Sequence, residues 1–182
     1  MIIRVLPRVL SCLLFLSLGL MASSQNIIPT KGKKFWLSFM ENFQGAEALE
    51  VFIASDNNTT GTIEMAGQGW SENFTVLANQ ITTIDLPASA ECIGNQQIFD
   101  NGVYIETEDT VAVFAINFME FTADASKILP IQSLGTEYRI SSYQGLSGLG
   151  SEFLIVATED DTEIEIIPSD NLDNGEPAGV PI

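Results

Sequence analysis

Short apolar clusters recur along the chain roughly every ten residues, and groups of Asn, Asp and Gly separate them. The clusters are rich in Val, Ile, Thr and Phe, which favour β-strands. Residues 82–86 alternate polar and apolar side chains, as in a half-buried strand, whereas residues 111–118 are almost all apolar, which predicts a strand covered on both faces. The best helix candidate, residues 118–127, has a poor helical period. The predicted strands are residues 50–54, 61–65, 73–77, 80–86, 103–107, 110–118 and 153–158. The pattern predicts an all-β fold of β-sandwich type.

The chain also resembles itself when it is shifted by 103 positions. Without gaps, the segment that begins at Gly32 lies over the one that begins at Gly135, and the strand at 50–54 lies over the strand at 153–158. This register predicts a tandem repeat of about 100 residues with a truncated second unit, and chance similarity between strand-like sequences is the alternative. The identical pairs include Gly32/Gly135, Ser38/Ser141, Gly45/Gly148, Ala54/Ala157 and Thr59/Thr162. The expected organisation is a signal peptide at 1–24, a lead at 25–31, a first sandwich unit at 32–118, a connection at 119–134 and an incomplete second unit at 135–182.

The first residues follow the order of a secretory signal. Arg4 and Arg8 precede a mostly apolar run from Val9 to Leu20, and the small residues Ala22 and Ser24 then suit a cleavage site before Gln25. The apolar run is too short for a transmembrane helix, which needs about 20 such residues. The sequence therefore predicts an exported protein, either secreted or held at the cell surface.

The net charge and the residue composition argue against several classes of function. The chain has 24 acidic and 7 basic residues, a net charge of −17, which repels nucleic acid and anionic lipid. It has no histidine, so the commonest general base and triad member is missing. Cys92 has no second cysteine to pair with after signal cleavage, and the prediction is burial or, as the alternative, a free thiol. These features predict a protein that is not an enzyme and that uses no cofactor.

Acidic residues that cluster in predicted turns raise calcium as the one metal to consider, because carboxylate oxygens are its preferred ligands. The alternative is that these charges only keep a β-rich surface soluble. The candidate ligands are Glu106, Glu108 and Asp109 in one turn and Glu159, Asp160, Asp161 and Glu163 in another.

Two further sets of residues bear on binding. Trp36 and Trp70 could stack on a sugar, although a tryptophan in a β-rich domain is more often part of the core. Asn57, Asn58 and Asn73 each begin an Asn-x-Ser/Thr sequon, which would mark a glycosylated turn in a eukaryotic host.

Several segments resemble the IgGFc-binding protein N-terminal domain family. They are Leu49–Thr59, Ala112–Asn117, Leu129-Pro130, Ser133–Tyr138 and Phe153–Ile164. The resemblance implies an extracellular, adhesive, multi-domain protein whose family domain continues past Ile182. It assigns no activity to particular residues, and antibody binding does not carry over residue by residue.

Together these observations predict an extracellular or cell-surface binding and adhesion module, the N-terminal part of a larger secreted protein. Its expected partner is an extracellular protein or carbohydrate. A structural β spacer of a surface protein is the first alternative. A glycan-processing enzyme with paired carboxylates is the second.

Overall fold

The computed structural model describes residues 28–141, 152–172 and 174–182. The predicted signal peptide lies outside these residues. The described part is all-β, as predicted, and contains three short 3₁₀ turns and no α-helix. The strands are β1 (Gly32–Leu37), β2 (Phe39–Met40), β3 (Ala48–Ala54), β4 (Thr59–Met65), β5 (Trp70–Val76), β6 (Ile81–Asp85), β7 (Glu91–Cys92), β8 (Val103–Met119) and β9 (Thr122–Ile128). The 3₁₀ turns are η1 (Ala66–Gln68), η2 (Ala88–Ala90) and η3 (Ile131–Ser133).

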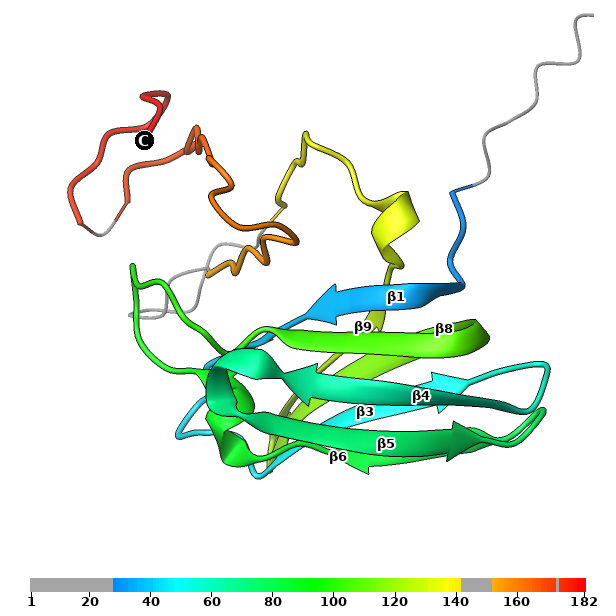
Figure 1. Cartoon of the computed structure of the whole chain (residues 1–182). Coiled ribbons are helices and arrows are strands. Elements are labelled where there is room, and N and C mark those ends of the chain that lie inside the picture. Colours follow the sequence, from blue (N-terminus) through cyan, green and yellow to red (C-terminus); the bar gives the residue numbers. More distant parts are fainter. Residues whose placement is uncertain (1–27, 142–151, 173) are drawn as a thin grey trace, which may run out of the picture.

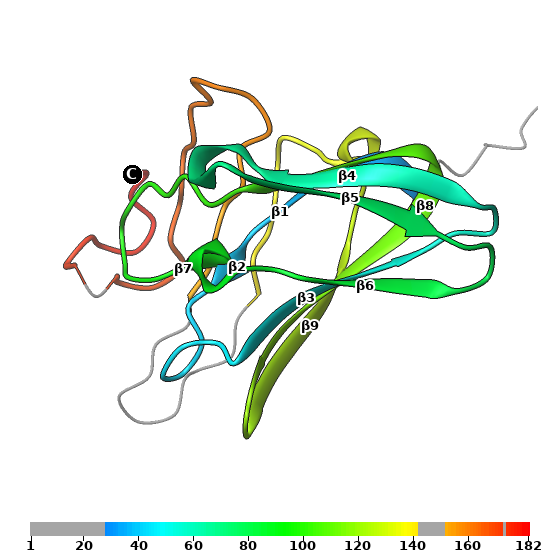
Figure 2. The same cartoon turned by 60° about the horizontal axis from the view of Figure 1, so that its bottom comes forward.

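The 17-residue strand β8 organises the fold, because it takes part in two layers. Its first half pairs antiparallel with β1 on one side and β4 on the other, and β4 pairs with β5 (Figure 1). Its second half pairs antiparallel with β3 and β9, and β3 pairs with β6. Figure 2 shows β4 and β5 above and β3, β6 and β9 below, so the antiparallel sheet curls into a two-layered structure.

Two contacts close the sides of this structure where the main sheet is not continuous. The Thr82 hydroxyl at the start of β6 donates to the Thr75 carbonyl in β5 at 2.8 Å, which links the two layers where no strand ladder joins them. At the end where β8 begins, β2 and β7 form a short parallel pair, with Phe39 opposite Glu91 and Met40 opposite Cys92.

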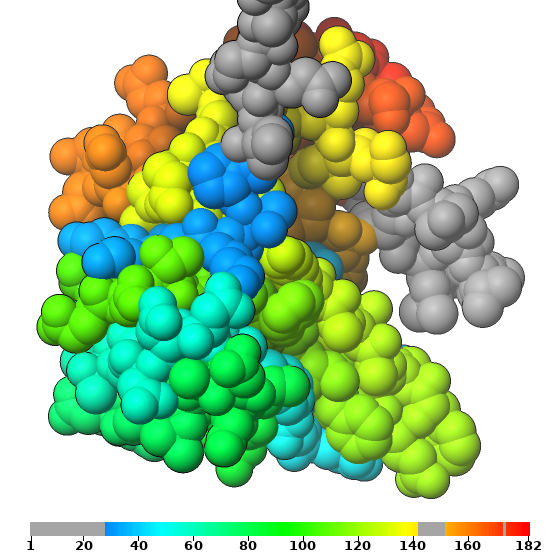
Figure 3. Space-filling model, turned by 90° about the vertical axis from the view of Figure 1, so that its right-hand side faces the viewer, coloured from blue at the N-terminus to red at the C-terminus, as the bar shows by residue number. Residues whose placement is uncertain are grey.

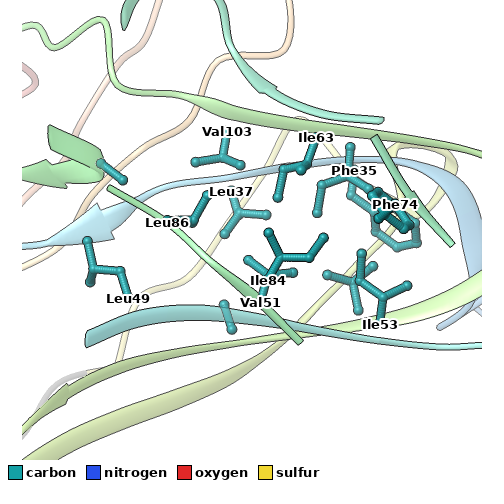
Figure 4. Packing of buried hydrophobic residues seen from close by; sticks show 14 of the residues in the cluster. Phe35, Leu37, Leu49, Val51, Ile53, Ile63, Phe74, Ile84, Leu86 and Val103 are labelled. Carbon is teal, nitrogen blue, oxygen red and sulfur yellow. The ribbon is translucent and has the colours of Figure 1, made fainter. Parts of the chain in front are cut away.

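The core lies between the two layers. In β3, for example, every second side chain is buried, and Figure 4 shows Phe35 and Ile63 of the upper layer facing Val51, Ile53 and Ile84 of the lower one. Burying a side chain of this size stabilises the fold by about 1.5–3 kcal/mol. The inward positions of β3 and β6 are those that the alternating pattern predicts.

The structure corrects the sequence analysis along β8 and β9. The two predicted strands at 103–107 and 110–118 are one continuous strand, which changes layer between them. The outer face of its second half is open in the described part of the chain, where Phe114 is exposed beneath the Lys127 ammonium, 5.6 Å from the ring centroid. The prediction that residues 111–118 are covered on both faces is therefore wrong for the outer face.

The segment after Phe118 also differs from its prediction. The expected connection at 119–134, which includes the helix candidate, contains β9, and β9 pairs with β8 from Met119 to Val113. The first β unit therefore extends to Ile128. A local sequence window does not show this, because pairing with β8 and not local propensity makes residues 122–128 a strand.

Residues 152–172 and 174–182 contain no strand, so the strand predicted at 153–158 is absent. The apolar side chains of Phe153 and Ile155 are exposed there. Ile166 and Ile182 exchange two backbone hydrogen bonds of 3.0 Å each. A strand needs a partner ladder for its backbone groups, and none reaches residues 153–158 in the described part of the chain. The tandem repeat and its truncated second unit stay predictions.

Candidate binding face

The first group of calcium candidates lies inside β8 and not in a turn. Glu106 points outward, where it forms a 3.0 Å ion pair with Lys34 and accepts a 3.1 Å hydrogen bond from the Tyr104 hydroxyl. Asp109 accepts hydrogen bonds from the Asn57 side-chain amide at 2.9 Å and from the Thr110 backbone N–H at 2.7 Å. Glu108 is exposed, and only its carbonyl is engaged, by the Lys33 ammonium at 2.7 Å. The carboxylates of Glu106 and Asp109 thus have different protein partners and do not converge on one point.

The second group lies in a turn, as predicted. The Thr162 hydroxyl donates to the Glu159 carbonyl at 2.7 Å, and Asp161 has a left-handed backbone with φ of 56°. Asp160 and Glu163 are exposed beside them. Within the residues that the structure describes, no three acidic, histidine or cysteine side chains lie close enough to hold a metal ion. Calcium binding stays a prediction.

The outer face of the upper layer gathers side chains suited to binding. The strand alternation that sends Phe35 inward sends Lys34 and Trp36 outward, and the outward residues of β8 beside them are Tyr104 and Glu106. The ladder pairs Trp36 with Tyr104 and Lys34 with Glu106. The Trp36 and Tyr104 rings lie 4.9 Å apart, tilted by 41°. We call Lys34, Trp36, Tyr104 and Glu106 the Trp36 face.

The same cross-strand rows continue over β4 and β5. Glu106 is opposite Thr62, which is opposite Asn73, and Tyr104 is opposite Glu64, which is opposite Ser71. Along these rows, the aromatic pair is followed by hydroxyl, carboxylate and amide groups on the outer face of the same sheet. Such a mixture can stack on an apolar surface and exchange hydrogen bonds with a polar one.

Electrostatics fix the charged members of the Trp36 face in their ionised forms. The hydrogen bond and charge of Glu106 hold the pKa of Lys34 above its usual value. The hydrogen bonds from Lys34 and Tyr104 hold the pKa of Glu106 below its usual value. Burial, followed by the hydrogen bond to Glu106, raises the pKa of Tyr104, so its hydroxyl stays a donor at neutral pH.

A shallow groove borders the Trp36 face on β4 and β5. It has a volume of about 310 Å³ and is lined by Thr60, Gly61, Thr62, Asn73, Phe74, Thr75 and Glu108. Gly61 is required at its base, because a Cβ there would lie 2.5 Å from the Glu106 carbonyl oxygen and 2.6 Å from the Phe74 ring. The sequon residue Asn73 opens onto the groove.

The two tryptophans have different roles. Trp70 is partly buried against the core, as the more frequent role of a tryptophan predicts. Trp36 is half-buried outside the core cluster and lies on the outer face. Cys92 is buried, and its sulfur lies 3.2 Å from the Ser38 hydroxyl. The prediction of burial is confirmed for this cysteine.

Sequence reasoning missed a buried polar network at the end of the fold near β2 and β7. The Glu91 carboxylate, 7% exposed, accepts the backbone N–H of Asn42 at 2.7 Å and that of Ala46 at 3.0 and 3.1 Å. The Asn42 amide donates to Asn117 at 2.8 Å, and the Thr122 hydroxyl donates to Asn42 at 2.7 Å. These residues are far apart in sequence and form no motif, so only the fold brings them together.

No helix in the described ranges is long and apolar enough to cross a membrane.

Comparison with known proteins identifies one family model and one relative to which the chain is similar. Residues 124–182 match the family model described as IgGFc binding protein, a stretch that begins inside β9. The human IgGFc-binding protein is 29% identical over 141 residues, which cover 74% of this chain and 3% of that protein. The chain therefore spans a small fraction of this relative's length. No solved structure matches the chain significantly.

The two matches agree with the motif segments found in the sequence. The relative's match extends over most of the chain, and the family model matches the segment that contains Ser133–Tyr138 and Phe153–Ile164. On these grounds the chain is similar to the IgGFc-binding protein, by a family model over residues 124–182 and by a human relative over most of its length.

Proposed function

We propose that this chain is an extracellular, non-catalytic binding module that contacts its ligand through the Trp36 face. The observation that carries the proposal is the outward Trp36–Tyr104 pair, 4.9 Å apart, beside the Lys34–Glu106 ion pair. Tryptophan, tyrosine and arginine dominate binding energies at protein surfaces, because rigid aromatic rings bury much area at little entropic cost. A core position would have hidden Trp36 from any ligand.

The scaffold supports binding because it holds these groups in fixed positions. Trp36 and Tyr104 lie on paired strands whose opposite faces form the core, so neither backbone can move without disturbing Phe35 or Ile105. The Glu106 carboxylate orients both the Lys34 ammonium and the Tyr104 hydroxyl. A preorganised site loses less entropy when a ligand binds.

Catalysis is disfavoured by the chemistry of the available groups. The chain has no histidine, and Glu106 and Asp109 are engaged with protein partners that favour their ionised forms. A general acid needs a raised pKa, and both of these are lowered.

Similarity to the IgGFc-binding protein supports an extracellular partner. The human relative is named for binding the Fc part of IgG, and Fc is thus one ligand to test. The predicted signal peptide at residues 1–24 fits export, and the small share of the relative that the chain covers fits a module of a larger protein. The ligand is an extracellular protein or carbohydrate.

An array of glycans and extracellular proteins, with IgG Fc among them, tests the proposal on residues 25–182. We expect at least one ligand above background, and Trp36→Ala to weaken it by about thirtyfold, the loss of an aromatic hot spot of about 2 kcal/mol. The matched control is Thr83→Ala, an exposed residue of β6 in the other layer, which should bind as the wild type does.

Two results would count against the proposal. Binding to nothing in the array would favour the alternative of a structural spacer. Equal binding by Trp36→Ala and Thr83→Ala would show that the ligand uses another surface.

A further inference from the structure

Three exposed phenylalanines gather at one end of the lower layer. Phe43 is 60% exposed in the loop before β3, Phe118 is 41% exposed near the end of β8, and Phe121 is 95% exposed in the turn between β8 and β9. We call this set the aromatic end. Single exposed apolar residues are ordinary, but a group of large ones marks an interaction site.

Hydrogen bonds bring together the three chain segments that carry these phenylalanines. Thr122, the chain neighbour of Phe121, donates its hydroxyl to Asn42 at 2.7 Å, and Asn42 is the chain neighbour of Phe43. The Glu47 N–H, from the same loop as Phe43, donates to the Phe118 carbonyl at 2.8 Å. Figure 3 shows the yellow-green β8–β9 hairpin projecting at the lower right of the molecule, where a partner can reach it.

The aromatic end stands on a rigid base. Asn42, Asn117 and Glu91 are buried, and every hydrogen bond among them fixes the loop of Phe43 against β7 or β8. Buried and satisfied polar networks of this kind specify one arrangement of the backbone. The rings are therefore presented on a fixed support.

The backbone at Phe121 is unfavourable for its side chain. Its φ is 75°, in the left-handed region that Gly and Asn adopt readily and bulky residues avoid. A ring that is 95% exposed gains almost nothing from the protein's own core in return. Strain retained at an exposed aromatic residue points to a role in recognition.

The charges around the aromatic end decide what it can bind. The exposed acids beside it are Glu41, Glu47, Glu120 and Asp124. The one basic residue of the β8–β9 hairpin, Lys127, lies over Phe114. A second copy of the chain would bring the same acids and the same net charge of −17, and anionic lipid would be repelled in the same way.

We propose that the aromatic end of Phe43, Phe118 and Phe121 docks a protein partner whose surface combines apolar side chains with Lys and Arg. The rings fill the apolar part of that surface, and the bordering carboxylates attract its basic rim and reject acidic partners. This site goes beyond the proposed function, since it shares no residue with the Trp36 face and does not require that face to bind anything.

The test uses a synthetic amphipathic peptide of Leu and Lys, with a counterpart in which Glu replaces Lys. Fluorescence anisotropy measures the affinity of each for residues 25–182. We expect the Lys peptide to bind, the Glu peptide not to bind, and added salt at about 0.5 M to weaken the Lys complex. Phe121→Gly should weaken it by about tenfold or more.

The Phe121→Gly variant separates binding from folding, because glycine relieves the left-handed strain. Its melting temperature should equal or exceed that of the wild type. The matched control is Ile98→Ala, which removes an equally exposed apolar side chain from the loop between β7 and β8 and should leave the affinity unchanged. Trp36→Ala should also leave it unchanged, so that failure of this site and failure of the Trp36 face are distinguishable.

Each other outcome overturns the proposal. Absence of Lys-peptide binding, equal binding of the Glu peptide, or full affinity in Phe121→Gly would each do so. Sedimentation that reveals Phe121-dependent dimers would identify a second copy as the occupant. Phe121-dependent binding to phosphatidylcholine vesicles, without peptide binding, would identify a membrane instead.

Discussion

Replacing Glu91 by alanine tests how the buried polar network supports the fold. The substitution removes the acceptor of two backbone N–H groups, those of Asn42 and Ala46, at a position that is nearly sealed from water. A buried donor left without a partner costs about 1–3 kcal/mol. Ala46 is only partly buried, so water can replace its lost acceptor, and the removal of a buried charge recovers part of the loss. We expect a loss of about 2–4 kcal/mol, a large part of the usual 5–15 kcal/mol.

Urea unfolding of residues 25–182, followed by tryptophan fluorescence, measures this loss. The midpoint should fall while the slope of the transition stays unchanged, since the surface exposed on unfolding is the same. Glu91→Gln keeps one acceptor oxygen but makes weaker, neutral hydrogen bonds, so its loss should be about 1 kcal/mol. Glu120→Ala, an exposed acid in the β8–β9 turn, serves as the matched control and should change stability by less than about 0.5 kcal/mol. If Glu91→Ala is as stable as Glu120→Ala, the network does not hold the loop, and the account of the rigid end is wrong.

Three further predictions concern pH, calcium and the C-terminal segment. The Thr110 N–H and the Asn57 amide hold the pKa of Asp109 below its ordinary value of 3.8. The ionised Asp109 therefore stabilises the fold above pH 3.8, and this stabilisation is lost as the pH falls through the lower pKa of the folded state. When the unfolding midpoint is measured against pH, it should decline less at low pH in Asp109→Asn than in the wild type, and an equal decline would contradict this. EDTA should lower the melting temperature by far less than the roughly 10 °C that a saturated calcium site at 100 times its dissociation constant would supply; a drop of that size would establish a metal site at an acidic turn. Hydrogen exchange should be slow at residues 111–118 and fast at 153–167. Equally slow exchange at both would place these residues in one sandwich, and the prediction of a repeat with an incomplete second unit would be wrong.

The strands that are best predicted from sequence are those with one face toward the core and the other toward solvent. β3, β4, β5 and β6 lie within a few residues of their predicted ranges, because apolar residues that face the core recur at every second position. β9 was missed since Thr122–Ile128 has little strand propensity and becomes a strand through its ladder with β8. The continuity of β8 was missed since Glu108 and Asp109 look like a turn, although their backbone stays extended while the strand changes layer.

The candidate sites, too, could be predicted from sequence only in part. Trp36 was named from sequence, but its outward position depends on the inward register of Phe35, which single residues do not reveal. Tyr104 joined it only through the β1–β8 ladder. Phe121 carries no sequence signal, because its exposure and its left-handed backbone arise from the turn between β8 and β9. Residue types can be judged from sequence alone, whereas the faces they share follow from strand pairing.

The most direct test of the central claim is a calorimetric titration of the strongest array ligand into residues 25–182 and into the Trp36→Ala and Thr83→Ala variants. We expect about thirtyfold weaker binding by Trp36→Ala and wild-type affinity for Thr83→Ala, with both variants still folded at the temperature of the titration. Wild-type affinity in Trp36→Ala would contradict the assignment of the ligand to the outer face of β1 and β8.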